Sequence, residues 1–128
     1  MMYLLDTHTF LWYIFDDPRL PSQIKDIISD ADSVYVSMAT LWEISIKQSI
    51  KKLEFDSSIS YLGDMCVAKD FRLLNFSIPQ FDIMKSLPFF HNDPFDRILI
   101  AQALCNGLTL ITKDENIAKY DVPVLAFS

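Results

Sequence analysis

The sequence predicts one α/β domain over residues 1–128, built on a mostly parallel central sheet of about five short strands flanked by helices. Short apolar runs rich in β-branched and aromatic residues alternate with longer segments of helical periodicity, which is typical of this class. The length of 128 residues is that of a single compact domain, and 51% hydrophobic with 22% charged residues is the composition of a folded chain. Crossovers between parallel strands are expected to be right-handed.

The first elements are defined by apolar runs and by the residues that interrupt them. An apolar run at 3–5 predicts the first strand, and the segment 10–15 predicts a helix. The sequence Asp16-Asp17-Pro18 ends that helix. We expect Ser22 to cap a second helix over 22–30, in which the isoleucines share one face.

The middle of the chain continues the alternation. The β-branched run 34–36 predicts a second strand, and apolar residues at helical spacing predict a helix over 38–52. A further helix over 58–70 precedes a third strand at 72–75, and a short helix follows Pro79.

The last third of the chain has the clearest boundaries. Asp93-Pro94 opens a long apolar helix that runs to Asn106, and Gly107 ends it. A buried β-rich run at 108–112 predicts the fourth strand. Two elements complete the chain, a short helix over 113–120 and a final strand over 122–127.

Charge and glycine content exclude several classes of site. The chain has 11 basic and 17 acidic side chains, which gives a net charge of −6. A negatively charged protein does not bind nucleic acid through counterion release alone, because that requires basic side chains on the phosphates. A role on nucleic acid therefore requires local basic patches or bound cations. The two isolated glycines, Gly63 and Gly107, build no phosphate-binding loop of the Walker or Rossmann type.

Cysteine usage and hydropathy predict a cytoplasmic protein. Cys66 and Cys105 have neither metal-site spacing nor a disulfide framework, which suits a reducing compartment. The N-terminus lacks the basic region of a signal peptide. The longest uncharged run, 98–112, is too short to span a bilayer, so we expect no membrane segment.

Acidic side chains recur where the predicted strands end. Asp6 directly follows the first strand, and Asp114 lies two residues beyond the fourth. Asp93 and Asp96 begin the long helix, and Glu43 lies in the helix after the second strand. Because sites in open parallel sheets form beyond the carboxyl ends of the strands, we expect these acids to share one edge.

Each acid also has an ordinary structural interpretation. Asp6 or Thr7 would cap the first helix, and Asp114 would cap the short helix after the fourth strand. Glu43 with Lys47 has the spacing of a surface ion pair worth about 0.2–0.5 kcal/mol. Asp93 and Asp96 fit an N-cap and an acidic third helical position.

The convergence of these acids favours a cation site over the separate structural roles. Carboxylates gathered without basic neighbours repel one another unless a cation neutralises them. Oxygen ligands favour Mg²⁺ or Mn²⁺, which also bind substrate phosphate. An acidic protein handles RNA in this way, through the positive charge of its metal.

Four motifs together resemble those of PIN-domain ribonucleases, in particular VapC-type toxins. They occur in the family's order and span essentially the whole chain, and the third is highly specific. The motifs are Leu4 to His8 (LLDTH), Trp42 to Ile44 (WEI), His91 to Arg97 (HNDPFDR) and Thr112 to Asp114 (TKD).

The resemblance implies that Asp6, Glu43, Asp96 and Asp114 form an acidic quartet holding Mg²⁺ or Mn²⁺. Asp6 and Asp96 would be the principal ligands, and Asp114 would complete the site directly or through water. Glu43 would bind a second ion or position the attacking water.

The resemblance also implies supporting roles for residues near the four acids in the sequence. Thr112 would orient a ligand, and Arg97 would contact phosphate or form a structural salt bridge. Asp93 is assigned to helix capping, because the family's catalytic acid is the one before Arg97.

The implied reaction is hydrolysis of an RNA phosphodiester bond by a metal-activated water. The implied partners are the RNA substrate, a small VapB-like antitoxin protein and a second copy of the chain in a homodimer.

Three alternatives from other classes compete with the nuclease. A catalytically idle PIN-fold interaction module would keep the fold without the chemistry. A receiver-like phosphoacceptor domain needs an acid after the third strand, where the chain has Asn75, and an acid pair after the first. A haloacid-dehalogenase-like phosphatase needs a second acid at the position of His8.

The remaining candidates are assigned to packing or to the surface. His8 and His91 do not form a zinc site with the scattered cysteines, so we expect core or surface roles for them. Trp12 and Trp42 are expected in the core, with binding of a partner helix as the alternative for any of these aromatic residues that are exposed. A basic cluster on one helix predicts a solvated face, with RNA contact as the alternative, and consists of Lys47, Lys51 and Lys52.

Overall fold

A computed structural model describes residues 1–128 and confirms the α/β architecture. Its five strands form one sheet in the order β3-β2-β1-β4-β5, and every pair is parallel, so the sheet is fully rather than mostly parallel. The strands are β1 (Met2–Leu5), β2 (Ser33–Ser37), β3 (Arg72–Leu74), β4 (Thr109–Thr112) and β5 (Val124–Ala126).

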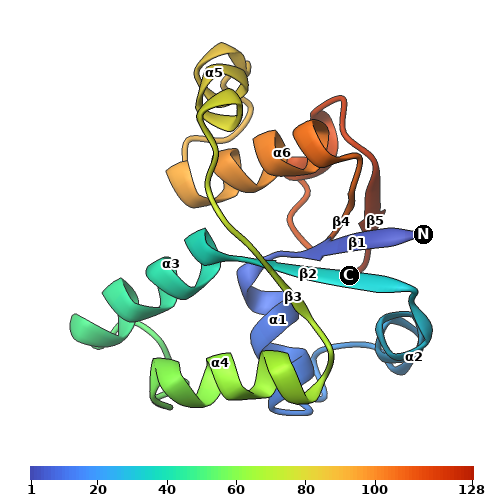
Figure 1. Ribbon diagram of the computed structural model, residues 1–128, viewed down its shortest axis with the longest axis vertical. Helices are drawn as coiled ribbons and strands as arrows, with labels where there is room; N and C mark the ends of the chain where they lie inside the picture. The colour runs from blue at the N-terminus through green and yellow to red at the C-terminus, as the bar shows by residue number, and fades with distance from the viewer.

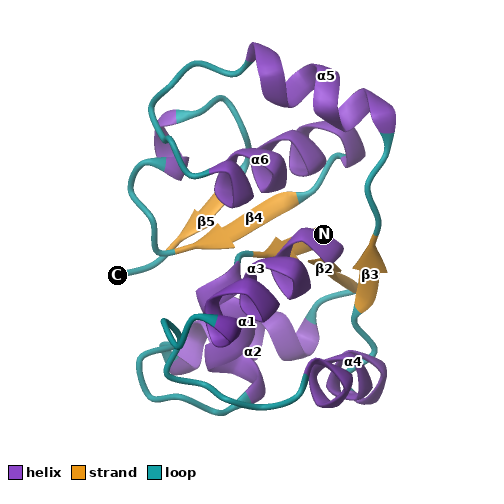
Figure 2. Ribbon diagram, turned by 90° about the vertical axis from the view of Figure 1, so that its left-hand side faces the viewer, coloured by secondary structure: helices purple, strands orange, loops and turns teal.

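Helices cover both faces of this sheet, as Figures 1 and 2 show from two directions. Helices α1 to α4 pack on one face, and α5 and α6 pack on the other. No helix combines the length and the apolar character needed to cross a membrane. The helices are α1 (Thr7–Ile14), α2 (Ser22–Asp30), α3 (Met38–Ser49), α4 (Ile59–Ala68), α5 (Ile78–Ser86), α6 (Pro94–Asn106) and the 3-10 helix η1 (Ile117–Lys119).

Two hydrophobic cores lie on opposite faces of the sheet. Successive side chains of a strand point to opposite faces. Leu5 and Ile111 therefore pack with the helices of the first face, and Leu4 and Leu110 pack with α6 on the second. All four are fully buried. Burial of both faces explains why the strands are continuous apolar runs instead of alternating ones.

The strand order changes direction between β1 and β4, and this positions the site. The chain proceeds outward from β1 to β2 and β3, then returns to the other side of β1 as β4. Ligand sites of open parallel sheets lie beyond the strand ends at such a switch. The backbone N–H of Asp6 donates to the carbonyl of Ile111 at 3.3 Å, which joins the ends of the two strands.

Several predicted boundaries are wrong for local reasons. Ser22 does not cap α2, because Pro21, with its extended backbone, occupies the N-cap position. Helix α3 ends at Ser49 instead of Lys52, and Lys51 adopts a left-handed φ of 56°. The helix predicted over 113–120 is only the short η1, because the Asp114 carboxylate accepts the N–H of Asn116 at 2.8 Å and forms a turn there.

Candidate active site

A cavity of about 550 Å³ lies where β1 and β4 end, and its walls are almost entirely polar. Only one of its 11 lining residues is hydrophobic. The lining residues are Asp6, Thr7, His8, Trp12, Glu43, Lys47, His91, Asp93, Asp96, Lys113 and Asp114. All four acids of the predicted quartet therefore face one cavity.

Asp6 has both of the roles considered for it, as helix cap and as cavity acid. Its Oδ1 accepts the N–H of Thr9 at 3.0 Å and so caps α1, while its Oδ2 accepts the hydroxyl of Thr112 at 2.5 Å. Burial raises the pKa of Asp6, and the hydrogen bonds from Thr112 and Thr9 oppose this rise. Both oxygens are thus held in place at the strand switch.

Thr112 connects the carboxylates that follow β1 and β4. Its hydroxyl donates to Asp6 and accepts the N–H of Asp114 at 2.9 Å. A buried hydroxyl that donates once and accepts once has a defined rotamer, so Thr112 sets the position of Asp6 and of the loop that carries Asp114.

The two aspartates that begin α6 have different environments. The Asp93 carboxylate accepts the N–H groups of Phe95 at 2.8 Å and Asp96 at 3.4 Å, which is N-cap geometry. Asp96 makes no such cap. Burial raises the pKa of Asp96 to about 7, helped by the negative charges of Asp93, Asp6 and Glu43 and opposed by His91.

The ion pair considered for Glu43 and Lys47 forms, but its placement at the surface is wrong, because Glu43 is buried. Only 4% of Glu43 is exposed, because α3 packs beside α1 and α6 at the cavity. Its Oε1 accepts the hydroxyl of Thr7, and its Oε2 accepts Nζ of Lys47, each at 2.5 Å. Burial opposes the charge of Lys47, but Glu43, Asp93 and Asp96 outweigh it and raise the pKa of Lys47.

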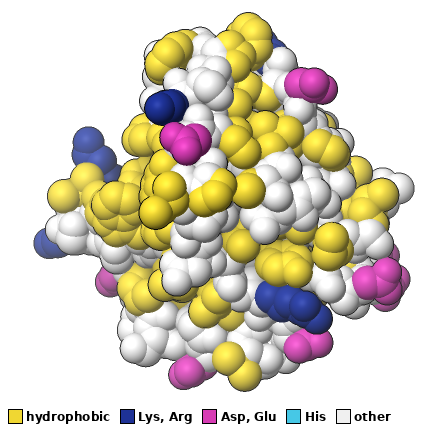
Figure 3. Space-filling view, turned by 45° about the horizontal axis from the view of Figure 1, so that its top comes forward, with side chains coloured by type: hydrophobic (Ala, Val, Ile, Leu, Met, Phe, Trp, Pro, Cys, Tyr) yellow, Lys and Arg dark blue, Asp and Glu magenta, His cyan; other side chains and the backbone are white.

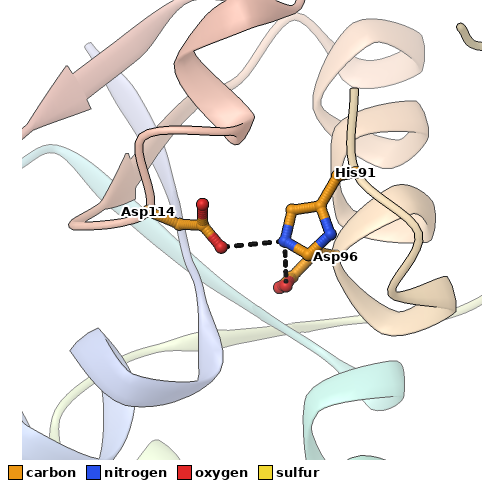
Figure 4. Close-up of side chains that lie close together, drawn as sticks. All are labelled: His91, Asp96 and Asp114. Carbon is orange, nitrogen blue, oxygen red and sulfur yellow. Dashed lines mark hydrogen bonds and ion pairs between the residues drawn. The ribbon is translucent and has the colours of Figure 1, made fainter. Parts of the chain in front are cut away.

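His91 is the cavity residue that sequence reasoning missed. Its Nε2 lies 2.8 Å from Oδ2 of Asp114 and 3.0 Å from Oδ2 of Asp96, between the two carboxylates (Figure 4). Spacing could not reveal this, because Asp114 lies 23 residues away. The available signal was its place just before the N-cap of the helix that carries Asp96.

Arg97 lies outside the cavity and forms no salt bridge, so the ion pair considered for it is wrong. The side chain is buried, and its guanidinium lies 4.1 Å from the ring centroid of Phe89. Its donors instead satisfy main-chain carbonyls in the last turn of α5 and in the segment between α5 and α6. Those carbonyls belong to Met84, Leu87, Pro88 and His91.

The two tryptophans differ in burial, and the predicted basic cluster is divided between α3 and the segment after it. Trp12 is buried as predicted and forms the apolar part of the cavity wall, whereas Trp42 is 57% exposed. Trp42 is outside the core because it lies on the outer face of α3, where its ring forms a T-shaped pair with that of Phe95. Lys51 and Lys52 follow the end of α3 and are exposed, so the basic cluster does not lie on one helix.

The donor set of the cavity fits a hard divalent cation. Five carboxylates line it against two lysines, Lys47 and Lys113, and one of these lysines is already paired with Glu43. The pKa of Asp96 is raised first by burial and then by the negative charges of Asp93, Asp6 and Glu43, which lie close enough to repel its carboxylate. Carboxylate oxygens in this density are the ligands preferred by Mg²⁺ and Mn²⁺.

Comparison with known proteins gives one family match for the sequence and several similar folds. The sequence model of the family described as PIN domain matches residues 3–123. No curated protein matches the sequence.

Solved structures with a similar fold include three complexes. A chain of VapBC2 from Rickettsia felis bound to a promoter DNA fragment has a TM-score of 0.75 and 14% identity, with both chains fully covered. A toxin–antitoxin complex from Klebsiella pneumoniae has a TM-score of 0.68 and 20% identity, covering 97% and 96% of the two chains. FitAcB from Neisseria gonorrhoeae has a TM-score of 0.65 and 22% identity, covering 98% and 96%.

Proposed function

The chain belongs to the PIN domain family, and from this premise we propose that it is a metal-dependent ribonuclease that hydrolyses RNA phosphodiester bonds. The observation that carries the proposal is the convergence of Asp6, Glu43, Asp96 and Asp114 on one cavity at the strand switch. Such a cavity repels a phosphate group unless a cation neutralises it, so metal dependence follows from its charge.

Asp6, Asp96 and Asp114 would hold the ion, Mg²⁺ or Mn²⁺, with Glu43 beside them. When bound, the ion supplies positive charge at the scissile phosphate and activates a water for attack. Thr112 orients Asp6 by its hydrogen bond, and Thr7 with Lys47 fixes Glu43.

The remaining cavity residues can receive the nucleic acid. Lys113 lines the cavity next to Asp114 in sequence, and its Nζ lies 5.4 Å from the ring centroid of Trp12. Of the two lysines in the cavity wall, Lys47 is paired with Glu43 and Lys113 has no carboxylate partner, so Lys113 supplies local positive charge for the nucleic acid.

The direct test is incubation of the purified protein with mixed RNA in Mg²⁺, in Mn²⁺ and in EDTA. We expect cleavage with either ion and none in EDTA, followed by gel electrophoresis of the products. Single-stranded DNA of matched length is the control for substrate class. Intact RNA under all conditions, together with no ion binding in a calorimetric titration, would instead favour the idle interaction module. Membership of the PIN domain family removes the receiver-like alternative.

We also propose that the protein is the VapC-type toxin of a toxin–antitoxin pair and forms a homodimer. Two exposed apolar surfaces support the proposal that the protein binds other protein chains. Helix α3 exposes a stripe at helical spacing beside the buried Glu43, and the face on which α5 comes forward in Figure 3 is widely covered by hydrophobic side chains. The α3 stripe consists of Met38, Trp42, Ile46 and Ile50, and the exposed apolar residues on and after α5 include Ile78, Phe81, Phe89 and Phe90.

The antitoxin would cover apolar surface and direct a basic side chain into the acidic cavity. Expression of the protein alone is expected to arrest bacterial growth, and co-expression of a small neighbouring gene should restore it. Growth curves and co-purification measure both effects, with Asp96→Asn as the non-toxic control. Normal growth with wild type, and no adjacent small gene, would contradict the toxin assignment.

A further inference from the structure

The imidazole of His91 is held at both ring nitrogens. Nδ1 accepts the backbone N–H of Asp93 at 3.1 Å. On the other side of the ring, Nε2 faces Oδ2 of Asp114 at 2.8 Å and Oδ2 of Asp96 at 3.0 Å (Figure 4). The ring therefore has one orientation, with its side chain only 14% exposed.

These three side chains have the outline of a metal site, since their candidate ligand atoms lie within 4.8 Å of one another. The hydrogen bond at Nδ1 contradicts that interpretation. A histidine that binds a metal offers a lone pair on one nitrogen and almost always donates the N–H of the other. Here the second nitrogen accepts from a backbone N–H, so the neutral ring carries its proton on Nε2. A protonated nitrogen has no lone pair for an ion.

We propose that His91 is a positioning residue that donates its Nε2–H to Asp114, with Asp96 beside the same nitrogen, and does not coordinate the divalent ion. This inference rests on the proposed function, because it assigns the ion to the carboxylates alone. A carboxylate has about four lone-pair sites, so Asp114 keeps free positions for an ion while it accepts from His91.

The main chain around His91 keeps the ring from turning. The backbone N–H of His91 donates to the hydroxyl of Tyr120 at 3.0 Å, and that hydroxyl donates to the carbonyl of Pro88 at 2.6 Å. Arg97 donates to the carbonyls of Pro88 at 2.9 Å and His91 at 3.4 Å. The buried Arg97 thus acts on the cavity indirectly, through the loop that carries His91.

The first experiment measures the tautomer by two-dimensional ¹H–¹⁵N NMR of the imidazole at about pH 8.5, above the usual histidine pKa. The chain has only two histidines, so His8→Gln assigns the spectrum. We expect the His91 proton on Nε2, both without metal and in saturating Mg²⁺. A proton on Nδ1, or loss of the Nε2 proton when Mg²⁺ is added, would overturn the proposal. This readout does not depend on nuclease activity.

The second experiment compares the Mn²⁺ affinity of two substitutions by calorimetry. His91→Gln keeps an N–H donor near the position of Nε2, whereas His91→Ala removes it. Loss of a hydrogen-bond partner of a ligating carboxylate weakens metal binding by about 10- to 100-fold, which we expect for His91→Ala. His91→Gln should bind near the wild-type affinity. Equal losses in both variants would contradict the positioning role.

His8→Gln is the matched control for the affinity measurement, because His8 lines the same cavity but forms no hydrogen bond to a carboxylate. Its Mn²⁺ affinity should equal that of wild type. Failure of wild type itself to bind Mn²⁺ would contradict the proposed function, while the NMR tautomer would still decide the role of His91.

Discussion

Asp96→Asn is expected to lower kcat/KM for RNA cleavage by about 10³-fold or more, and Asp6→Asn should have a similar effect. Asp6 is buried and Asp96 is half-buried at the cavity, and each substitution would remove a charged ligand for the ion. A catalytic ion stabilises transition-state charge by several kcal/mol, and each 1.36 kcal/mol corresponds to a tenfold change in rate. Initial rates on a labelled RNA, in saturating Mn²⁺, measure the effect.

Asp93→Asn is the matched control for this experiment. It removes the same charge from the same cavity wall, three residues before Asp96. Asparagine caps a helix as well as aspartate does, so α6 should still begin at Pro94 and most activity should remain. Equal losses at Asp6, Asp93 and Asp96 would contradict the assignment of Asp93 to helix capping.

The metal-free protein is expected to be less stable at pH 8 than at pH 5, and Asp96→Asn should reduce this difference. In the folded state the pKa of Asp96 is raised to about 7, so the folded protein binds more protons than the unfolded chain between about pH 4 and pH 7. Stability therefore falls as the pH rises through this window, by on the order of a few kcal/mol. Urea unfolding in EDTA at both pH values measures the change.

Other perturbed acids leave the sign of this prediction unchanged. Burial also raises the pKa of Asp6, which adds to the same trend. Hydrogen bonds from Arg19 lower the pKa of Asp17 to about 2. The stability that Asp17 contributes is therefore lost only as the pH falls below the pKa of the unfolded acid, which lies outside the range from pH 5 to pH 8.

Divalent ions should stabilise wild type and should not stabilise Asp96→Asn. At 100 times its dissociation constant an ion adds about 2.7 kcal/mol to the free energy of unfolding of wild type. In EDTA, Asp96→Asn should be as stable as wild type or more so. If Asp96 were only a helix-start acid, its loss would cost about 0.3–1 kcal/mol with or without ions. That cost, with no response of wild type to Mg²⁺, would contradict the acidic-site interpretation.

Local chemistry explains which elements were predictable. The Asp93-Pro94 start and the Gly107 stop of α6 are as predicted, because capping bonds and a left-handed φ of 65° depend on adjacent residues alone. Buried strands were recognisable because both faces of a parallel sheet are covered, which makes each strand a continuous apolar run. Where a competing local interaction exists, as at Pro21 or Asp114, the predicted boundary was wrong.

The sequence by itself determined the fold class and the order of strands and helices. It also determined which acidic residues lie at one edge of the sheet. Only the tertiary structure decided which polar side chains are buried there. The hydrogen bond from Thr112 to Asp6 spans 106 residues, and that from Thr7 to Glu43 spans 36. His91 meets Asp114 only after β4 has inserted beside β1. Local spacing does not record such contacts, because they form only when the chain folds back on itself.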